Sequence, residues 1–270
     1  MERIEIAKGC AYNAAETIRR MLNQTTDLET EIKEDQTIVT RLDKASKEVI
    51  YALLNKYCPD DAVLSEEFPE RAEHAVKQSS YWSIDELDGT VWCANGIFSE
   101  SSVSVGYVEN GVPVLGAICF LSKGFPRKRL PMVAAERGRG CFVDDKPCVI
   151  NFTKPLRRAV VGIDMNKKYT YPESFQKFIY PLQQSSEHTR TSSATFSILE
   201  LLQGKTGLYF ANGIKNWDIA AGAVAVEEAG GFFCHADGSP LEWNRIEFGN
   251  VFFFSNASIA AEAFAALEKR

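Results

Sequence analysis

The spacing of hydrophobic residues predicts two long helices in the first part of the chain. Apolar residues recur three or four positions apart near the start, which predicts a helix with one buried face. These residues are Ile4, Ala7, Ala11, Ala14 and Ile18. A second helix is expected over residues 43–57, because Pro59 follows closely and favours a helix end before it.

Short apolar or alternating segments up to about residue 150 predict an antiparallel sheet. The clearest hairpin joins residues 102–108 to 112–121, because Asn110-Gly111 between alternating segments is a strong turn signal. Further strands are expected over residues 62–64, 81–84, 132–135 and 141–143. We interpret this part as a meander of strands with the two helices packed on it.

Beyond Asn151 the pattern changes, and strands alternate with helices as in an α/β layer arrangement. Strands are expected over 159–163, 208–210, 232–235 and 251–254, and helices over 172–182, 195–202, 217–229 and 257–267. The predicted fold class is therefore α/β, with an α+β N-terminal half and an α/β C-terminal half. We expect two domains, residues 1–153 and 154–270.

Composition narrows the classes of function. The 270 residues are 45% hydrophobic and 24% charged, as expected of a globular protein. A net charge of −6 argues against a nucleic-acid partner, which would need a basic surface. Because no run of about 18 apolar residues and no apolar leader occurs, we expect no membrane partner and a cytoplasmic location. The seven scattered cysteines are expected to be free thiols.

The segment Asp-Glu-Leu-Asp-Gly-Thr carries the most chemical information. Asp85 and Asp88 follow an apolar strand, and carboxylates there suit a hard cation such as Mg²⁺. The Leu87 carbonyl can add a third oxygen. The N–H groups of Gly89 and Thr90, at a predicted helix start, can hold a phosphate oxygen. Taken alone, the same spacing also fits a turn followed by a helix cap.

Three further segments place acids beside predicted elements. They are Glu66 with Glu67 after a strand, Asp43 entering a helix, and Asp218 in the first turn of another. Each alone also fits a solvated acid or a cap. Together and in this order, the four segments resemble the pattern of the inositol monophosphatase family. These Mg²⁺-dependent, Li⁺-sensitive phosphatases include bisphosphate nucleotidases and fructose-1,6-bisphosphatases. The resemblance covers nearly the whole chain.

The resemblance implies a layered αβαβα sandwich that hydrolyses a small-molecule phosphate monoester. It also implies two or three Mg²⁺ per site, in-line attack by an activated water, and a homodimer. The implied metal ligands are Glu66, Asp85, the Leu87 carbonyl, Asp88 and Asp218. Glu66 would also be catalytic.

Further roles follow from the same resemblance. Asp43 and Thr90 would orient the attacking water, and the amides of Gly89 and Thr90 would hold the phosphate. Asp35 and Thr37 would lie in a mobile loop over the site. The residues expected to bind the substrate are Ser193, Ala194, Thr195, Ala211 and Lys215.

Two departures from the family pattern leave alternatives open. Glu86 replaces the usual Pro, and it either weakens activity, tunes metal affinity or points to solvent. Ala211 stands near the position of a Glu that binds inositol hydroxyls, which puts inositol selectivity in doubt. A 3′(2′),5′-bisphosphate nucleotidase and a sugar or histidinol phosphate phosphatase remain alternatives. A catalytically weak metabolite-binding or regulatory protein is the alternative of another class. Because every ligand type is retained, we expect an active enzyme.

Overall fold

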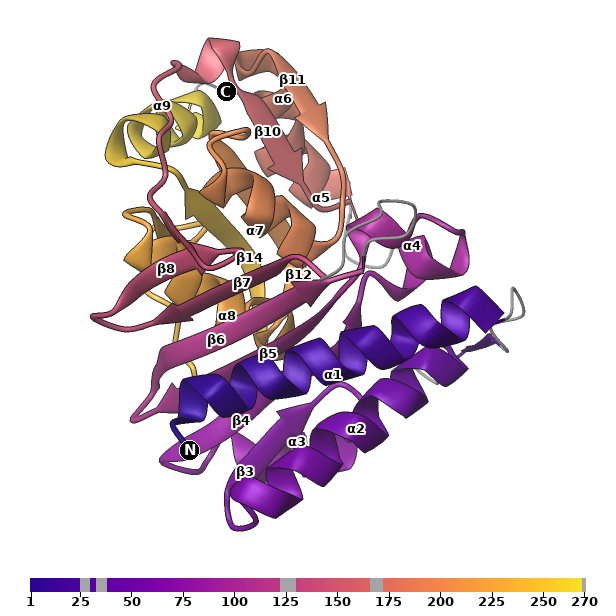
Figure 1. The fold of residues 1–270 in the computed structure, drawn as a ribbon. Helices are drawn as coiled ribbons and strands as arrows, with labels where there is room; N and C mark the ends of the chain where they lie inside the picture. Colours follow the sequence, from indigo (N-terminus) through magenta and orange to yellow (C-terminus); the bar gives the residue numbers. More distant parts are fainter. Residues whose placement is uncertain (25–29, 33–37, 122–129, 166–171, 269–270) are drawn as a thin grey trace.

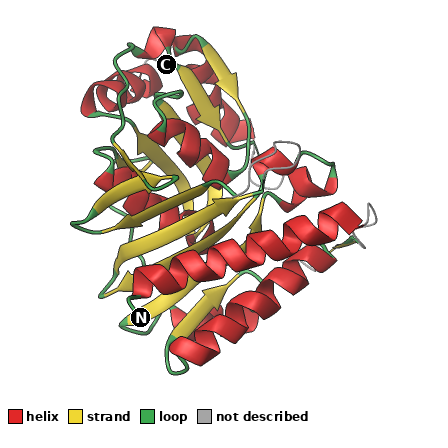
Figure 2. Cartoon of the chain, viewed as in Figure 1, coloured by secondary structure: helices red, strands yellow, loops and turns green. Residues whose placement is uncertain are grey.

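Two sheets and three layers of helices alternate in the computed structural model, which describes residues 1–24, 30–32, 38–121, 130–165 and 172–268. The layers follow the order helix, sheet, helix, sheet, helix (Figure 1). Figure 2 shows the same alternation by type of secondary structure. The αβαβα sandwich implied by the resemblance is therefore confirmed.

The larger sheet has seven strands that neighbour one another in chain order. The pairs from the second strand onward are antiparallel, as predicted for a meander. The first two strands are parallel, so the antiparallel prediction is wrong for the strand at 62–64: residues 66–79 form a crossover between them, with a helix over Pro69–Ala75. The predicted hairpin turns at Asn110 and Gly111, whose φ angles are 51° and 74°. The strands are β3 (Ala62–Ser65), β4 (Ser80–Asp88), β5 (Ser102–Glu109), β6 (Val112–Phe120), β7 (Met132–Glu136), β8 (Gly140–Val143) and β9 (Lys146–Cys148).

Two long helices, α1 (Arg3–Gln24) and α2 (Arg41–Tyr57), cover the outer face of this sheet (Figure 1). The predicted apolar stripe of α1 is buried with α2 in one hydrophobic cluster. Shorter elements complete this half. They are the hairpin β1 (Glu31–Ile32) and β2 (Ile38–Val39), and the helices α3 (Pro69–Ala75) and α4 (Thr90–Ala94).

The smaller sheet has five strands in the order β11-β10-β12-β14-β13. β10 is parallel to both its neighbours, and the remaining pairs are antiparallel. The strands are β10 (Val160–Ile163), β11 (His188–Arg190), β12 (Leu208–Lys215), β13 (Phe232–His235) and β14 (Glu247–Phe254). The outer face is covered by α5 (Pro172–Ser174), a π-helical turn (Phe175–Ile179), α6 (Tyr180–Ser185) and α9 (Ala257–Glu268).

The middle layer consists of α7 (Ala194–Leu202) and α8 (Asn216–Glu228), which pack between the two sheets. Close approach of α8 to the larger sheet depends on glycine. A Cβ on Gly116 of β6 would lie 2.4 Å from the Cα of Ala221, which is too close for any side chain. A third hydrophobic cluster, distinct from the outer two, fills this middle space.

The sequence analysis missed the short elements α3, β9 and β11. β9 and β11 have three residues each, too few for a periodic pattern to be recognised. The strand expected over 81–84 extends to Asp88, because an extra residue between Asp85 and Asp88 keeps it paired with β5. Within the described ranges, no helix is long and apolar enough to cross a membrane.

Candidate active site

Strand β4 ends at Asp88 and passes through Gly89 directly into helix α4. Gly89 has a φ of +80°, and a Cβ on it would lie 2.5 Å from the carbonyl oxygen of Glu100. Only glycine fits this turn, because any other residue would meet both backbone strain and a clash. The turn places Thr90 at the first position of α4, immediately beside the two aspartates.

An extra residue in β4 sets the direction of those aspartates. Asp85 is opposite Ser104 of β5 and Asp88 is opposite Ser102, so two residues of β4 face one residue of β5 between these pairs. Residues three apart on a regular strand point to opposite faces, and a bulge of one residue returns them to the same face. The Leu87 N–H also donates to Asp85 Oδ1 at 3.0 Å.

The predicted pair of Asp43 and Thr90 is in contact. The Thr90 hydroxyl lies 3.1 Å from Asp43 Oδ1 and 2.8 Å from the Leu87 carbonyl oxygen. Asp43 is held in the first turn of α2, because its Oδ2 accepts from the Thr40 N–H at 2.8 Å and the Thr40 hydroxyl at 2.7 Å. The capping box that starts α2 therefore also aims the second carboxylate oxygen at Thr90.

Asp88 joins the two halves of the chain. Its Oδ2 accepts from the N–H of Thr195 at 3.1 Å and contacts the Thr195 hydroxyl. Ser193 is the N-cap of the same helix, α7, so the carboxylate lies at a helix N-terminus, where negative charge is favoured. Burial raises the pKa of Asp88, while hydrogen bonds from Ser193 and Thr195 oppose that rise.

Asp218 approaches the same region from helix α8 of the middle layer. It lies in the first turn of α8, where its Oδ2 accepts from the Lys215 N–H at 2.7 Å. Burial, followed by repulsion from Glu66, raises the pKa of Asp218 well above its ordinary value. Asp88 and Asp164 add to that repulsion.

Asp85 lies at the centre of these acids and is 2% exposed. Burial raises its pKa well above the usual range, and so does repulsion from Glu66, Asp88 and Asp218. Glu66 directly follows β3, and its N–H donates to the carbonyl of Ile84 at 3.4 Å. The β3–β4 pairing therefore brings Glu66 to the end of the strand that carries both aspartates.

The donor set fits a hard divalent cation. Glu66, Asp85, Asp88 and Asp218 offer carboxylate oxygens, the ligands that Mg²⁺ prefers, and they repel one another as ionised groups. In the described part of the chain, no three Asp, Glu, His or Cys side chains already converge at coordination distance. The acids are thus close enough to repel one another, but their oxygens are not arranged at the distances of a metal coordination sphere.

Glu86 does not point to solvent, so that alternative is wrong. Its side chain is 1% exposed, and its Oε1 accepts from the Ser65 hydroxyl at 2.5 Å. Its Oε2 is buried without a hydrogen-bond partner among the described residues. Burial raises the pKa of Glu86 to about 8, and repulsion from Glu66 and Glu67 contributes to the shift.

Three residues near the acids were not among the predicted site residues. Asp164 follows β10, and acids at the carboxyl ends of parallel strands are a recognisable signal. The buried Tyr209 hydroxyl has no hydrogen-bond partner in the described ranges, and Asp164 and Asp88 help to raise its pKa. Arg190 pairs with Glu100 at 3.0 Å and Glu200 at 2.7 Å. Arg190 begins the segment 190–195 that resembles the family's substrate wall, whereas nothing in the local sequence around Tyr209 marks it.

The predicted substrate-binding residues lie in several separate places, unlike the predicted metal ligands. Ser193, Ala194 and Thr195 form the start of α7 beside Asp88. Ala211 is fully buried in the core between the sheets, and the Lys215 ammonium pairs with Glu247. Asp35 and Thr37, expected in a mobile loop, lie outside the described residues. The binding roles of all these residues stay predictions.

The chain is similar to known proteins over most of its length. The family model described as "Inositol monophosphatase family" matches residues 1–269. The chain is 29% identical over 237 residues to a Nus factor SuhB of Pasteurella multocida, covering 87% of this chain and 85% of that protein. It is 29% identical over 226 residues to a fructose-1,6-bisphosphatase/inositol-1-monophosphatase of Thermotoga maritima, covering 83% and 80%.

A solved structure shares the fold. It is an IMPase/NADP phosphatase complexed with Mg²⁺ and phosphate, 20% identical, with a TM-score of 0.78 over 94% of this chain and 92% of that one. The layered fold, the acids at the end of β4 and these likenesses define a phosphoric monoester hydrolase. The chain belongs to the inositol monophosphatase family.

Proposed function

We propose that the protein hydrolyses a small-molecule phosphate monoester in a Mg²⁺-dependent reaction. The observation that carries this proposal is the end of β4. There Asp85 and Asp88 share a face, the Gly89 turn follows, and Thr90 contacts Asp43 at 3.1 Å. This arrangement combines oxygen donors for a cation, N–H groups for a phosphate and an acceptor for a proton.

Asp43 and Thr90 have the geometry to prepare a water for attack. The Thr90 hydroxyl can donate to Asp43 Oδ1 while its oxygen accepts from a water. As that water attacks phosphorus, Thr90 takes its proton and passes its own proton to Asp43. The Thr40 N–H and hydroxyl hold the other oxygen of Asp43, so this carboxylate stays aimed at Thr90 throughout.

Glu66, Asp85, the Leu87 carbonyl, Asp88 and Asp218 would hold two or three Mg²⁺ ions. Bound divalent cations would neutralise these acids and stabilise negative charge on the attacking and leaving oxygens. The N–H groups of Gly89 and Thr90 would orient the phosphate at the start of α4. The start of α7 and residues Ala211 and Lys215 remain the proposed substrate wall. Ala211 lacks the carboxylate that would select inositol.

A phosphate-release screen tests the proposal. The panel is inositol monophosphates, adenosine 3′,5′-bisphosphate, fructose-1,6-bisphosphate and histidinol phosphate, each with Mg²⁺ and with EDTA. We expect Mg²⁺-dependent release from at least one ester, loss of release in Asp88→Asn, and inhibition by Li⁺. If no ester in the panel is hydrolysed above the Asp88→Asn background, the proposed activity is wrong.

Two further proposals concern the domains of the chain and its oligomeric state. We propose a division into residues 1–153 and 154–270, supported by the larger sheet ending at Cys148 and the smaller one starting at Val160. We also propose a homodimer, for which family membership is the support. Light scattering on the purified protein would give twice the chain mass if that is correct.

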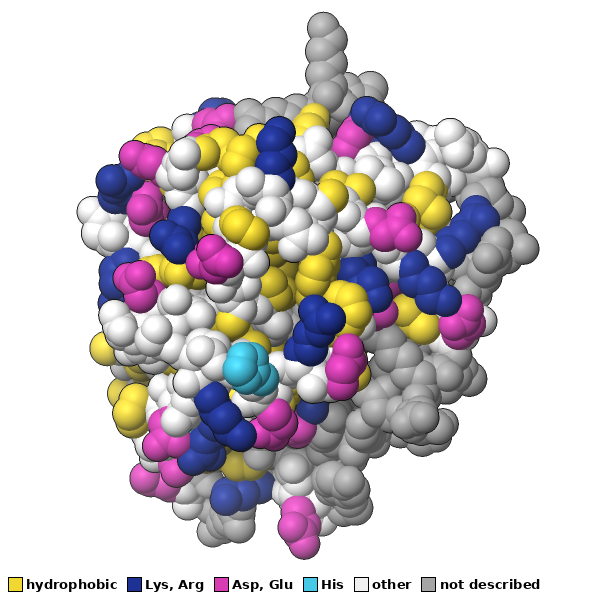
Figure 3. Space-filling view, turned by 90° about the horizontal axis from the view of Figure 1, so that it is seen from below, with side chains coloured by type: hydrophobic (Ala, Val, Ile, Leu, Met, Phe, Trp, Pro, Cys, Tyr) yellow, Lys and Arg dark blue, Asp and Glu magenta, His cyan; other side chains and the backbone are white. Residues whose placement is uncertain are grey.

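The SuhB likeness favours one alternative of another class, a regulatory role, because Nus factor is not the name of an enzyme. On the face seen in Figure 3, basic side chains are interspersed with acidic ones rather than gathered into a continuous basic tract. Binding of a nucleic acid depends mainly on such a tract. We therefore place the phosphatase first. If this protein binds phosphate esters but does not hydrolyse them, the regulatory role becomes the better proposal.

A further inference from the structure

Two cysteines lie opposite each other on the hairpin formed by β8 and β9. Cys141 pairs with Cys148 in the antiparallel register, and the turn between the strands is at Asp144 and Asp145. Directly opposite residues of an antiparallel pair have Cα atoms about 4.5–5.5 Å apart. Disulfides span about 4.4–6.8 Å between Cα atoms, so the register places the two cysteines at a Cα separation that a disulfide can bridge.

The two thiols have different surroundings. Cys141 is 2% exposed and belongs to the core between the sheets, whereas Cys148 is partly buried on the edge strand β9. The Cys141 thiol hydrogen-bonds to the Cys148 sulfur, which lowers the pKa of Cys148 to about 7 and raises that of Cys141. Partly accessible cysteines with a lowered pKa are the reactive ones, because the thiolate is the nucleophile.

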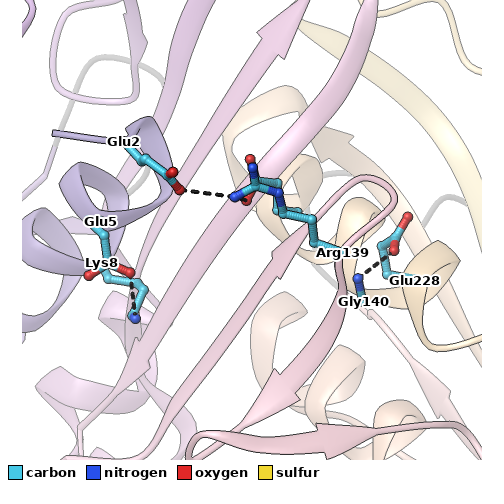
Figure 4. Close-up of polar contacts among 7 residues, drawn as sticks. Glu2, Glu5, Lys8, Arg139, Gly140 and Glu228 are labelled. Carbon is cyan, nitrogen blue, oxygen red and sulfur yellow. Dashed lines mark hydrogen bonds and ion pairs between the residues drawn. The ribbon is translucent and has the colours of Figure 1, made fainter.

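The base of the hairpin is fixed to the end of helix α8. The Gly140 N–H donates to Glu228 Oε2 at 2.8 Å, as Figure 4 shows, and the Gly138 N–H donates to Glu228 Oε1 at 2.8 Å. Because Gly140 directly precedes Cys141, this anchor holds the backbone beside one of the two cysteines in place. The Cys148 thiol donates to the carbonyl of Leu202, at the end of α7, over 3.4 Å.

We propose that Cys141 and Cys148 form a redox modification site, a dithiol that a peroxide oxidises to a disulfide across the hairpin. The thiolate of Cys148 attacks one oxygen of hydrogen peroxide, forming an S–O bond and breaking the O–O bond. The hydroxide that leaves takes a proton and becomes water, and Cys148 becomes a sulfenic acid.

Cys141 then acts as the resolving thiol. Its sulfur attacks the Cys148 sulfur, the S–S bond forms and the S–O bond breaks, and the departing hydroxide takes the Cys141 proton as water. Overall the two thiols lose two hydrogens and one peroxide is reduced to two waters. The disulfide leaves no S–H on Cys148, so the Leu202 carbonyl loses a donor on oxidation.

Peptide mass spectrometry tests the proposal on the full chain. Residues 140–157 form one tryptic peptide with both cysteines, because Lys146 and Lys154 each precede Pro, which blocks cleavage. After peroxide treatment of the folded protein, we expect this peptide to lose two hydrogens and to resist alkylation until dithiothreitol is added. Cys119 and Cys234, alkylated after unfolding, should remain free thiols. A peptide that stays reduced, or gains oxygen without losing hydrogens, would overturn the proposal.

Two serine variants test the order of attack. In Cys141→Ser, the sulfenic acid of Cys148 should accumulate and be trapped by dimedone. In Cys148→Ser, which keeps a donor for the Leu202 carbonyl, Cys141 should stay unreacted. Dimedone labelling of Cys141 at the wild-type rate in Cys148→Ser would show that the assigned nucleophile is wrong. If Cys141→Ser does not fold, brief peroxide exposure of the wild type with dimedone should still label Cys148 first.

Discussion

Helix α8 carries acids at both ends, and the two ends differ in what those acids contact. At its start, Asp218 lies beside Glu66, Asp88 and Asp164, all of which carry the same sign of charge. The backbone N–H of Lys215 donates a hydrogen bond to the Asp218 carboxylate. The pKa of Asp218 is raised, which means that the folded protein disfavours the ionised carboxylate.

At the other end of α8, the acids have partners of opposite charge or polarity. Glu227 pairs with Arg137 at 2.6 Å, and Glu228 accepts from the N–H groups of Gly138 and Gly140. These contacts fix the turn between β7 and β8 onto the helix. The carboxylates at this end of α8 therefore stabilise the packing of the β7–β8 turn against the helix.

The helix dipole alone would predict the opposite ranking, since it favours acids at the start and disfavours them at the end. It contributes only about 0.3–1 kcal/mol at a helix end, whereas burial and like charges can shift a pKa by several units. Burial and nearby charges therefore change the pKa of a carboxylate more than its position on the helix does. Buried acids that repel one another are retained at a cost in stability, and such sites are typically functional.

The largest effect is expected from a variant at the start of α8, where the acids repel one another. Asp218→Asn should lower kcat/KM by about 10³-fold, the upper end of the loss seen when one electrostatic group of an active site is removed. In Mg²⁺-free buffer the same change should raise Tm, because it removes a buried repulsion. Phosphate release and thermal unfolding measure the two. A variant that loses both activity and stability would place Asp218 with the structural acids.

The next effect concerns the contact between Thr90 and Asp43. Thr90→Val keeps the shape of the side chain but removes the hydroxyl that lies 3.1 Å from Asp43 Oδ1. We expect kcat to fall by about 10²-fold, the lower end of the range for general acid–base groups, because a water can partly replace the hydroxyl. Thr90→Ser is the matched control and should retain most of the activity. Equal kcat values for Thr90→Val and wild type would exclude this role.

Much of the fold could be predicted because its elements are long and periodic. The apolar stripe of α1 and the Asn110-Gly111 turn are local signals, and both were read correctly. The full length of β4 could not be predicted, since the bulge between Asp85 and Asp88 depends on pairing with β5. The same holds for β9 and β11, which exist only as partners of longer strands.

The site residues also divide into those that local motifs predict and those that only the packing of the fold brings together. Motif order was enough to select Asp43, Thr90, Asp85 and Asp88, which the structure brings near one another. Tyr209 was beyond reach, because its hydroxyl is brought to the acids by β12 packing rather than by any local pattern. Whether Glu86 is buried was also undecidable, since that depends on Ser65 of the neighbouring strand. The cysteine pair shows the same limit, because register, not spacing, makes Cys141 face Cys148.

A smaller effect is expected from Glu86, through pH. Its pKa is about 8 in the folded chain against an ordinary value of 4.5, so the folded state binds this proton more tightly than the unfolded state. The stability it contributes is fully present below pH 4.5 and is lost as pH rises to about 8. In Mg²⁺-free buffer, Glu86→Gln should therefore raise Tm at pH 9 relative to wild type and change it little at pH 5. Parallel Tm profiles for the two proteins would mean that Glu86 does not titrate in this range.

The smallest expected effect lies at the end of α8 and completes the comparison with Asp218. Glu228→Ala removes the acceptor for the Gly138 and Gly140 N–H groups, both of which can turn partly to water. We expect unfolding free energy to fall by about 1 kcal/mol, the usual net value of a hydrogen bond, with kcat/KM unchanged. Urea unfolding and the phosphate-release assay give both numbers. Stability should thus fall at Glu228 and rise at Asp218 in Mg²⁺-free buffer, while activity is lost only at Asp218. If Glu228→Ala lowers activity as strongly as Asp218→Asn, the two ends of α8 are not independent, and repulsion from buried like charges does not distinguish functional acids from structural ones.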